Sequence, residues 1–320
     1  MRFPMMLTLA AGLVATTASA QENWPNKPVR MVVTSAAGGG FDLMARILAE
    51  GLSQQLGQNV IVENLAGAGG LRAVRTVVRG DADGYTFLFN GPQHASLPYA
   101  YKEPGYDVKA DLASVSLVAQ YPMVLVTSPQ VPAKTFAEFV AMVKAAPGKY
   151  TFGSSGLGGA SHIAIEAFKH QAGLDMVHVP FRGSGETTAA LFGGQIDLVS
   201  DGLAAQLGNI KEGRVRPLTI VGDKRSPMLP DVPATTETYP GLSFPLWVAV
   251  FAPAKTPAAI VDRMNGAIAA ALKMPAIKKR YEDLLVETVG SSRSELDAFL
   301  DKQLAMNKDV IERANIKVGE

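Results

Sequence analysis

The chain has 320 residues, enough for two domains of modest size, and with 48% hydrophobic and 18% charged residues it is not an intrinsically disordered protein. The formal net charge is only +1 and no long run of Lys or Arg occurs, so the sequence predicts neither a nucleic-acid-binding nor a membrane-binding surface. There is no cysteine, which excludes disulfides, thiol chemistry and lipid attachment to cysteine.

The first twenty residues have the pattern of a secretory signal peptide. One basic residue precedes an apolar middle, and Ala18 and Ala20 form an A-x-A cleavage signal, so we expect cleavage after Ala20. A buried amino-terminal helix is the alternative. Removing residues 1–20 removes only Arg2 among the charged residues and leaves 29 basic and 29 acidic ones. No later apolar stretch is long enough for a transmembrane helix, so an exported protein of the bacterial periplasm is expected.

Strand-like and helix-like segments alternate along the rest of the chain, which predicts an α/β fold with mainly parallel sheets. Most of the strand-like runs are continuously apolar, as in strands covered on both faces. They lie at 29–35, 60–65, 86–91, 115–120, 123–128, 150–155, 176–181, 196–201, 217–222 and 246–252. Helices are predicted at 42–56, from Thr135 to the stop at Pro147-Gly148, at 160–172, 185–192 and 257–273, and from Ser292 onward.

Local signals define several of these helices. Helix 42–56 is expected to bury one stripe of leucine and isoleucine side chains, namely Leu43, Ile47, Leu48, Leu52 and Leu56. Thr135 with Glu138, and Ser292 with Glu295, have the spacing of a capping box. Ser184 is expected to cap helix 185–192, and Gly173 to close helix 160–172.

Two strand-to-helix turns resemble each other and are rich in glycine. The first glycine turn (residues 34–42) reads TSAAGGGFD, and the second glycine turn (residues 153–162) reads GSSGLGGASH. A helix N-terminus presents unpaired N–H groups and a partial positive charge, and glycine lets a ligand approach the backbone. The two turns, one in each of two lobes, therefore predict an anion site that needs no Lys or Arg and that could hold the two ends of a small di-acid. The alternative is that both are only tight turns.

Several side chains near these turns are candidates for ligand contact, each with an alternative role. Asp42 either complements the helix dipole or contacts a ligand. His162 either donates to a carboxylate or caps and packs, and Ser154, Ser155 and Ser161 add hydroxyl groups. Gln93 and His94 follow a strand on an expected loop, either at the cleft or on the surface.

The sequence also suggests roles for five residues outside the glycine turns. Arg182 and Asp201 each follow a strand, where ligand clefts of α/β proteins form, although Arg182 also suits a structural ion pair. His178 alternates within an apolar strand and is expected in the core. Trp24 and Trp247 are expected to pack inside the protein.

Motifs of enzymes and of metal sites are missing from the sequence. GLGGAS from Gly156 and GAGGLR from Gly67 miss the third glycine of the dinucleotide-binding pattern, and there is no G-x-S-x-G or P-loop sequence. The four histidines are scattered, so neither a metal site nor a cofactor is predicted. A hydrolase or isomerase using Ser155, His162 and Asp201 remains an alternative without support from spacing.

Long stretches of the chain resemble the substrate-binding proteins of tripartite tricarboxylate transporters, the Bug family. The resemblance begins with WPNKPVRMVVTSAAGGGFDLMARILAEGLSQQLGQNVIVENLAGAGG and continues through DGYTFLF, VPAKTFAEFVAMVKAAPGKYTFGSSGLGGASHIAIEAFK, VHVPFRGSGETTAALFGGQIDLVSD, GDKRSPMLPDVPATTE and FAPAKTPAAIVDRMN. It covers nearly all of the chain after residue 20.

This resemblance implies a monomeric, non-enzymatic receptor with the two-lobed, type II-like "Venus flytrap" fold of periplasmic binding proteins. Residues 21–122 and 240–320 would form lobe 1 and residues 123–239 lobe 2, with hinges near 120–123 and 225–245. The receptor would close on a small carboxylate, such as a di- or tricarboxylate or an aromatic acid, and deliver it to a membrane permease. A sensor that hands its loaded form to a signalling partner is a further alternative.

The implied ligand-binding residues lie in both glycine turns and after two other strands. They are Ala37, Gly38, Gly39, Gly40, Phe41, Asp42, Gln93, His94, Ser154, Ser155, Gly158, Gly159, Ala160, Ser161, His162 and Asp201. The chain departs from the family pattern at Ala36 and Ala37, where prolines are usual, and at Phe41, where a hydroxyl residue is usual. Phe41 favours a flatter or more apolar acid, such as an aromatic carboxylate. Arg182 stands where Lys is common and adds bidentate geometry.

Overall fold

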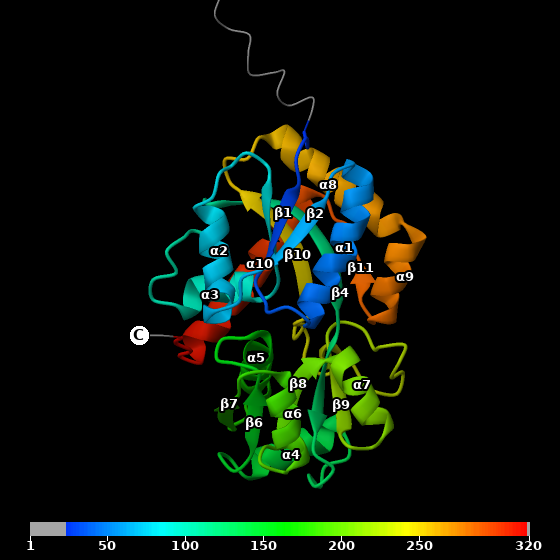
Figure 1. The fold of residues 1–320 in the computed structure, drawn as a ribbon. Helices are drawn as coiled ribbons and strands as arrows, with labels where there is room; N and C mark the ends of the chain where they lie inside the picture. Colours follow the sequence, from blue (N-terminus) through cyan, green and yellow to red (C-terminus); the bar gives the residue numbers. More distant parts are fainter. Residues whose placement is uncertain (1–23, 319–320) are drawn as a thin grey trace, which may run out of the picture.

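The computed structural model describes residues 24–318, so the predicted signal peptide and its cleavage site lie outside the described residues. Figure 1 shows two lobes, each built around one sheet with helices packed on it. The predicted two-lobed α/β architecture is confirmed, and the predicted residue boundaries of the lobes stay a prediction.

The sheet of lobe 1 has the strand order β11-β4-β10-β3-β1-β2. β1 is parallel to β2 and β3, whereas β10 is antiparallel to β3 and β4, and β11 is antiparallel to β4. The strands are β1 (Val29–Val33), β2 (Val60–Asn64), β3 (Thr86–Asn90), β4 (Leu112–Tyr121), β10 (Leu246–Pro253) and β11 (Glu287–Thr288).

The sheet of lobe 2 has the order β7-β6-β8-β5-β9. β6 is parallel to β7 and β8, whereas β5 is antiparallel to β8 and β9. The strands are β5 (Met123–Thr127), β6 (Thr151–Ser154), β7 (Val177–Pro180), β8 (Leu198–Gly202) and β9 (Arg216–Val221).

Both sheets are mixed, so the expectation of mainly parallel sheets is wrong. The strands that carry the chain between the lobes cause the difference. β4 leaves lobe 1 where β10 enters it, and Leu246 pairs with Tyr121 at that end, so the two strands run in opposite directions. β5 likewise begins in lobe 2 where β8 and β9 end, because Met123 pairs with Gly202 and Val221. The carboxyl ends of β1, β3, β6 and β8 consequently face the other lobe.

Helices cover both faces of each sheet and enclose four apolar clusters. On lobe 1, one face carries α1 (Gly40–Leu56), α8 (Ala258–Lys273) and α9 (Pro275–Asp283), and the other carries α2 (Leu71–Val78), α3 (Gln93–Ala100) and α10 (Arg293–Arg313). On lobe 2, one face carries α4 (Phe136–Ala145) and α5 (Ala160–Ala172), and the other α6 (Ser184–Phe192) and α7 (Leu203–Lys211). Two 3-10 turns lie at η1 (Ala68–Gly70) and η2 (Thr235–Glu237).

The last helix connects the lobes a third time. Leu296 and Leu300 of α10 lie in an apolar cluster of lobe 1, whereas Val310 and Ile311 lie in a cluster of lobe 2. The chain then returns, and the Val318 N–H donates to the Ala100 carbonyl at 2.9 Å. Between residues 24 and 318, no helix has both the length and the apolarity needed to cross a bilayer.

The local predictions have mixed outcomes. Helix 160–172 is confirmed to the residue, and Ser292 and Glu295 form the expected capping box. Leu43, expected in the buried stripe of α1, is 41% exposed because it points away from the sheet in the first turn. Ser184 is the first helical residue rather than the cap, which is Gly183, and its hydroxyl donates to Asp201 instead.

Candidate functional site

A cleft of about 820 Å³ lies between the two lobes, where the parallel strands of both sheets end. Both glycine turns reach it, as predicted from their similar sequences. Of the predicted site residues, nine line the cleft: Gly40, Phe41, Gln93, Ser155, Gly158, Gly159, Ala160, Ser161 and Asp201. The other seven lie outside this lining: Ala37, Gly38 and Gly39 are exposed, and Asp42, His94, Ser154 and His162 are buried.

Five helices begin at this cleft, because each directly follows a strand that ends there. They are α1, α3, α5, α6 and α7, and Gly40, Gln93, Ala160, Ser184 and Gly202 at or next to their first residues all line the cleft. The N–H groups of a first helical turn have no acceptor within the helix, so the five helix starts direct donors and partial positive charge toward one space. The sequence indicated only the starts of α1 and α5 as anion sites.

The N-caps of α1 and α5 are Gly39 and Gly159, which have no side chain with which to accept from these amides. Ser, Thr, Asp or Asn is preferred at this position because its side chain pairs with an amide of the first turn. Both helices therefore leave main-chain donors free for another acceptor, such as a ligand oxygen.

Asp42 braces the first glycine turn from beneath. Its carboxylate accepts from the Gly38 N–H at 2.9 Å, from Arg46 Nε at 3.0 Å and from Asn64 Nδ2 at 3.0 Å. The Arg46 guanidinium, helped by the two other donors, lowers the pKa of Asp42 to about 2 despite its burial. Since Asp42 is only 4% exposed and these contacts occupy both oxygens, the structure places it in a bracing role and not at the cleft surface.

His162 braces the second glycine turn in the same position. Its Nδ1 accepts from the Gly158 N–H at 3.1 Å, and its ring stacks on His178 with centroids 3.8 Å apart. Burial lowers the pKa of His162 to about 3, with smaller contributions from His178 and Lys169, so the ring is neutral. Ser154, also buried, donates to the Gly156 carbonyl at 3.1 Å. His178 is half-buried in this stack, not deep in the core.

Gln93 and His94 belong to α3 and not to a loop, which corrects the prediction. His94 is fully buried, stacks on Phe251 with centroids 4.0 Å apart and accepts from Asn90 Nδ2 at 3.2 Å. Burial lowers its pKa to about 3. Gln93 lines the cleft, and its buried Oε1 has no hydrogen-bond partner among the described residues. Gln93 is thus poised for a polar ligand group, whereas His94 is part of the lobe 1 core.

Phe41 forms part of the cleft surface, although its ring is fixed by lobe 1. It meets Phe89 edge to face at 6.3 Å between centroids. A Cβ added at Gly91 would come within 2.3 Å of the Phe41 ring, so only glycine at position 91 leaves room for it. The sequence correctly placed an aromatic ring at the cleft.

Arg182 and Asp201 are the charged residues of the cleft lining within residues 24–318. Asp201 accepts from Ser184 Oγ at 3.0 Å, from the Gly202 N–H at 2.8 Å and from Gln206 Nε2 at 2.9 Å. The guanidinium of Arg182 has no carboxylate of the described residues within 4 Å; its main-chain N–H donates to Glu186. The structural ion pair considered for Arg182 is therefore absent, and its charge is available at the cleft.

The three residues of the alternative hydrolase do not form a catalytic arrangement. Ser155 Oγ lies 3.1 Å from Ser161 Oγ, whereas His162 binds Gly158 and stacks on His178. The contacts of Asp201 are with Ser184, Gly202 and Gln206. Nucleophilic catalysis needs a serine within hydrogen-bond reach of its base, and Ser155 is engaged elsewhere. In residues 24–318, no group of three or more His, Asp or Glu side chains is placed to bind a metal ion.

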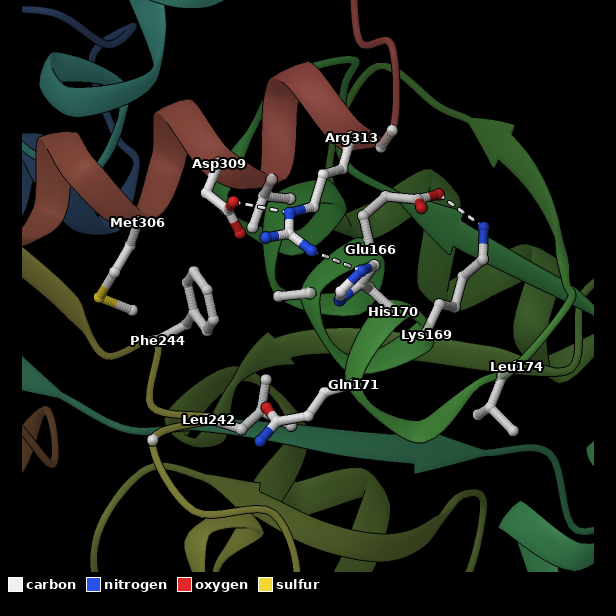
Figure 2. A pocket seen from close by; sticks show the side chains of 14 residues that line it. Glu166, Lys169, His170, Gln171, Leu174, Leu242, Phe244, Met306, Asp309 and Arg313 are labelled. Carbon is white, nitrogen blue, oxygen red and sulfur yellow. Dashed lines mark hydrogen bonds and ion pairs between the residues drawn. The ribbon is translucent and has the colours of Figure 1, made fainter.

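A second cavity of about 370 Å³ lies between α5, α10 and residues 241–244 (Figure 2). Its charged side chains are already paired with one another. Arg313 donates to Asp309 at 2.6 Å and to His170 at 2.8 Å, and Lys169 contacts Glu166 at 2.8 Å. The cleft, which combines free helix N-termini with an unpaired cation, is the stronger candidate for an anion site.

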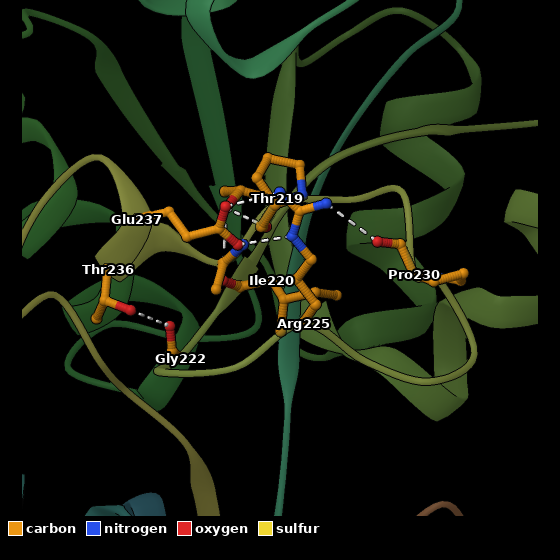
Figure 3. Close-up of polar contacts among 9 residues, drawn as sticks. Thr219, Ile220, Gly222, Arg225, Pro230, Thr236 and Glu237 are labelled. Carbon is orange, nitrogen blue, oxygen red and sulfur yellow. Dashed lines mark hydrogen bonds and ion pairs between the residues drawn. The ribbon is translucent and has the colours of Figure 1, made fainter.

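The segment that returns to lobe 1 is fastened to lobe 2 over its first part (Figure 3). Arg225 binds both oxygens of Glu237 at 2.7 Å and the Pro230 carbonyl at 3.2 Å, and Thr236 donates to the Gly222 carbonyl. These contacts exclude residues 225–237 as the flexible part of the hinge expected near 225–245. The remaining stretch, 238–245, and the short link at 120–123 stay the predicted hinges.

Most of the chain is similar in sequence to known proteins. The family model described as the tripartite tricarboxylate transporter family receptor matches residues 44–316. BugT of Bordetella pertussis is 34% identical over 275 residues, which cover 85% of this chain and 83% of BugT.

Solved structures of similar sequence share the whole fold. A Rhodopseudomonas palustris protein solved with adipate is 31% identical with a TM-score of 0.81, and the match covers 92% of this chain and 99% of that chain. MatC of the same organism, solved with bound malate, is 28% identical with a TM-score of 0.78, covering 90% and 100%.

Proposed function

The chain belongs to the tripartite tricarboxylate transporter receptor family, and from that premise we propose that it captures a small carboxylate in the interlobe cleft, in the periplasm, and delivers it to the membrane permease of such a transporter. The observation that carries the proposal is the convergence of five helix N-termini on the cleft, four of them with glycine as the N-cap residue. Similar proteins solved with adipate and malate support the carboxylate class.

The mechanism follows from the position of the donors. A carboxylate entering the open cleft meets the free amides at the starts of α1 and α5, the Ser155 hydroxyl and the Arg182 guanidinium. Closure of the lobes brings both sets of donors onto the ligand and excludes water, which strengthens each hydrogen bond. The closed form presents a surface that the open form lacks, and a permease can distinguish the two.

The test fills the cleft without disturbing the fold. Gly40 is the first residue of α1 and lines the cleft, and a Cβ added there would meet no atom within 4 Å. We expect Gly40→Leu to weaken carboxylate binding in calorimetry by at least about tenfold. Gly266→Leu is the matched control, since Gly266 also lies in a helix with free space around it but far from the cleft.

The ligands are a panel of mono-, di- and tricarboxylates, each recovered after binding and analysed by mass spectrometry. One acid bound stoichiometrically and recovered unchanged supports the proposal. The proposal is overturned if no carboxylate binds, if the recovered acid is chemically altered, or if Gly40→Leu binds as well as Gly266→Leu.

A further inference from the structure

The charge of the cleft is distributed unequally between the lobes. Its charged lining residues, within residues 24–318, are Arg182 and Asp201, and both belong to lobe 2. Asp201 accepts three hydrogen bonds inside lobe 2, all from uncharged donors, and Arg182 is the cationic side chain of the described lining. Arg182 lies beside the second glycine turn, because the neighbouring Phe181 N–H donates to the Ser154 carbonyl at 2.9 Å. A ligand group facing lobe 1 meets no cationic side chain among the described residues of the cleft lining.

The helix N-termini are unequal as well. The first turn of α1 contains the buried carboxylate of Asp42, which offsets part of the positive potential at that helix start, although Arg46 pairs with it. The first turn of α5 contains His162, which is neutral and offsets none of it. The stronger anion site is therefore on lobe 2, at the second glycine turn.

Lobe 1 contributes an apolar wall to the lining of the cleft, defined here as Phe41, Met44, Leu284 and Val286. Contacts with neighbouring elements hold the residues of the wall in place. Tyr281 donates to the Met44 carbonyl at 2.8 Å and so ties the end of α9 to α1. Phe41 is fixed over Gly91 and against Phe89, as described above.

The turn that supplies two residues of this wall has an unusual backbone. Leu285 has φ +57°, a left-handed conformation that glycine normally adopts after a helix and that costs other residues about 1 kcal/mol. Hydrogen bonds from the Leu285 N–H to Glu282 and from the Val286 N–H to Tyr281 hold it there. The neighbours of Leu285 on both sides, Leu284 and Val286, line the cleft.

We propose that the ligand is an acid with a single carboxylate and an apolar body. The carboxylate binds lobe 2 at the second glycine turn and Arg182, and the body lies on the apolar wall of lobe 1. This inference rests on the proposed function and narrows its ligand class. A second carboxylate lying on this wall would lose its water against apolar side chains without gaining a cation, which is costly.

The test compares hexanoate with adipate, which have six carbons each and differ in the second carboxylate. Calorimetry with the chain lacking residues 1–20 should show hexanoate binding at least about tenfold more tightly. Equal or tighter binding of adipate overturns the inference and leaves the proposed function standing. If neither acid nor any other carboxylate of the panel binds, the proposed function fails as well.

A pair of variants locates the apolar body. Leu284→Arg places a second cation on the wall and should reverse the order, so that adipate binds more tightly than hexanoate. Leu284→Met keeps the wall apolar and should keep the preference for hexanoate. Far-ultraviolet circular dichroism checks that both variants fold. If a folded Leu284→Arg prefers hexanoate as strongly as Leu284→Met does, the ligand body does not contact the wall and the inference is wrong.

Discussion

The two glycine turns have the same geometry and different chemistry. In each, the third residue of the helix reaches back over a glycine N-cap to the N–H of the glycine before it. Asp42 accepts from Gly38 at 2.9 Å, and His162 accepts from Gly158 at 3.1 Å. The glycines have φ +85° and +71°, so both turns use the same left-handed step.

The chemical difference decides what each turn can offer an anion. A carboxylate under a helix N-terminus satisfies the positive end of the dipole from inside, whereas a neutral imidazole satisfies one amide and leaves the charge uncompensated. The likeness of the backbones therefore places donors on both lobes, and the difference between the bracing side chains assigns the stronger anion site to lobe 2. The predictions below test each half of this statement.

Lowering the pH should produce the largest difference in stability between the two glycine turns. The pKa of His162 lies near 3 in the folded protein against 6.5 when exposed, so the unfolded chain takes up the proton first. Its contribution to stability is complete above about pH 6.5 and is lost as the pH falls toward 3. The pKa of Asp42 is about 2 against 3.8, so its contribution is complete above about pH 4 and is lost between 4 and 2. The second turn should loosen first.

The measurement is the free energy of unfolding by urea as a function of pH. Between pH 6 and 4 each histidine with a lowered pKa contributes a slope of up to about 1.4 kcal/mol per pH unit, and His94 and His178 add to that of His162. In His162→Asn the slope should be smaller by the contribution of one histidine, up to about 1.4 kcal/mol per pH unit. Glu166, 3.8 Å from His162 Nε2, and Lys169 are the other charged groups beside the ring. An unchanged slope would show that His162 does not titrate with folding.

Removing the carboxylate of the first turn is the next largest change. Asp42→Ala leaves the Gly38 N–H and the Asn64 amide without their acceptor and Arg46 without its partner, in a buried place. We expect a loss of about 3 kcal/mol in unfolding free energy. The control is Asp309→Ala, which removes an exposed helical pair with Arg313 and should cost much less. Equal losses in the two variants would refute the bracing role of Asp42.

Removing the imidazole of the second turn should cost less, because a neutral acceptor is lost. His162→Leu leaves the buried N–H of Gly158 unpaired, and about 2 kcal/mol is expected. The amide oxygen of Asn can occupy the place of Nδ1, so His162→Asn should recover part of the loss at pH 7. Ligand affinity should follow the same order, since Gly158 lines the cleft. Asn behaving like Leu would mean that ring stacking and not the hydrogen bond holds the turn.

The sequence showed where both turns lie because their signals are local. Continuous apolar runs mark strands, and ten strands were predicted in this way; the glycine-rich stretches after two of them mark the turns that lead into α1 and α5. The helices α2, α3, α7 and α9 were not predicted, and two of them lack clear local signals. α3 begins after Pro92 and contains Pro98, and α7 has glycine both as its cap and inside it. Their tertiary packing, against the cores of the two lobes, decides that they form.

The contacts by which Asp42 and His162 hold the two turns could not be predicted from the sequence, for a different reason. Asp42 and His162 were both candidates for ligand contact, and sequence alone does not show which way a side chain points. Asn64 is 22 residues from Asp42, and His178 comes from a neighbouring strand. Arg182 was open between an ion pair and the ligand, which depends on where acidic side chains end up after folding. Such contacts join distant segments, and periodicity carries no information about them.

The glycines themselves give the smallest and sharpest comparison. Gly38→Ala and Gly158→Ala both force alanine into a left-handed backbone, at about 1 kcal/mol each. An alanine Cβ at position 38 meets nothing within 4 Å, whereas at position 158 it lies 3.0 Å from Val318 and 3.5 Å from Ala100. Both neighbours belong to lobe 1 or to the segment after α10, so Gly158→Ala should cost more in urea unfolding and also hold the lobes apart. Small-angle scattering with saturating ligand should then show a more open form for Gly158→Ala than for Gly38→Ala. Identical scattering and identical unfolding would mean that the contact between the second turn and the last residues of the chain has no part in closure.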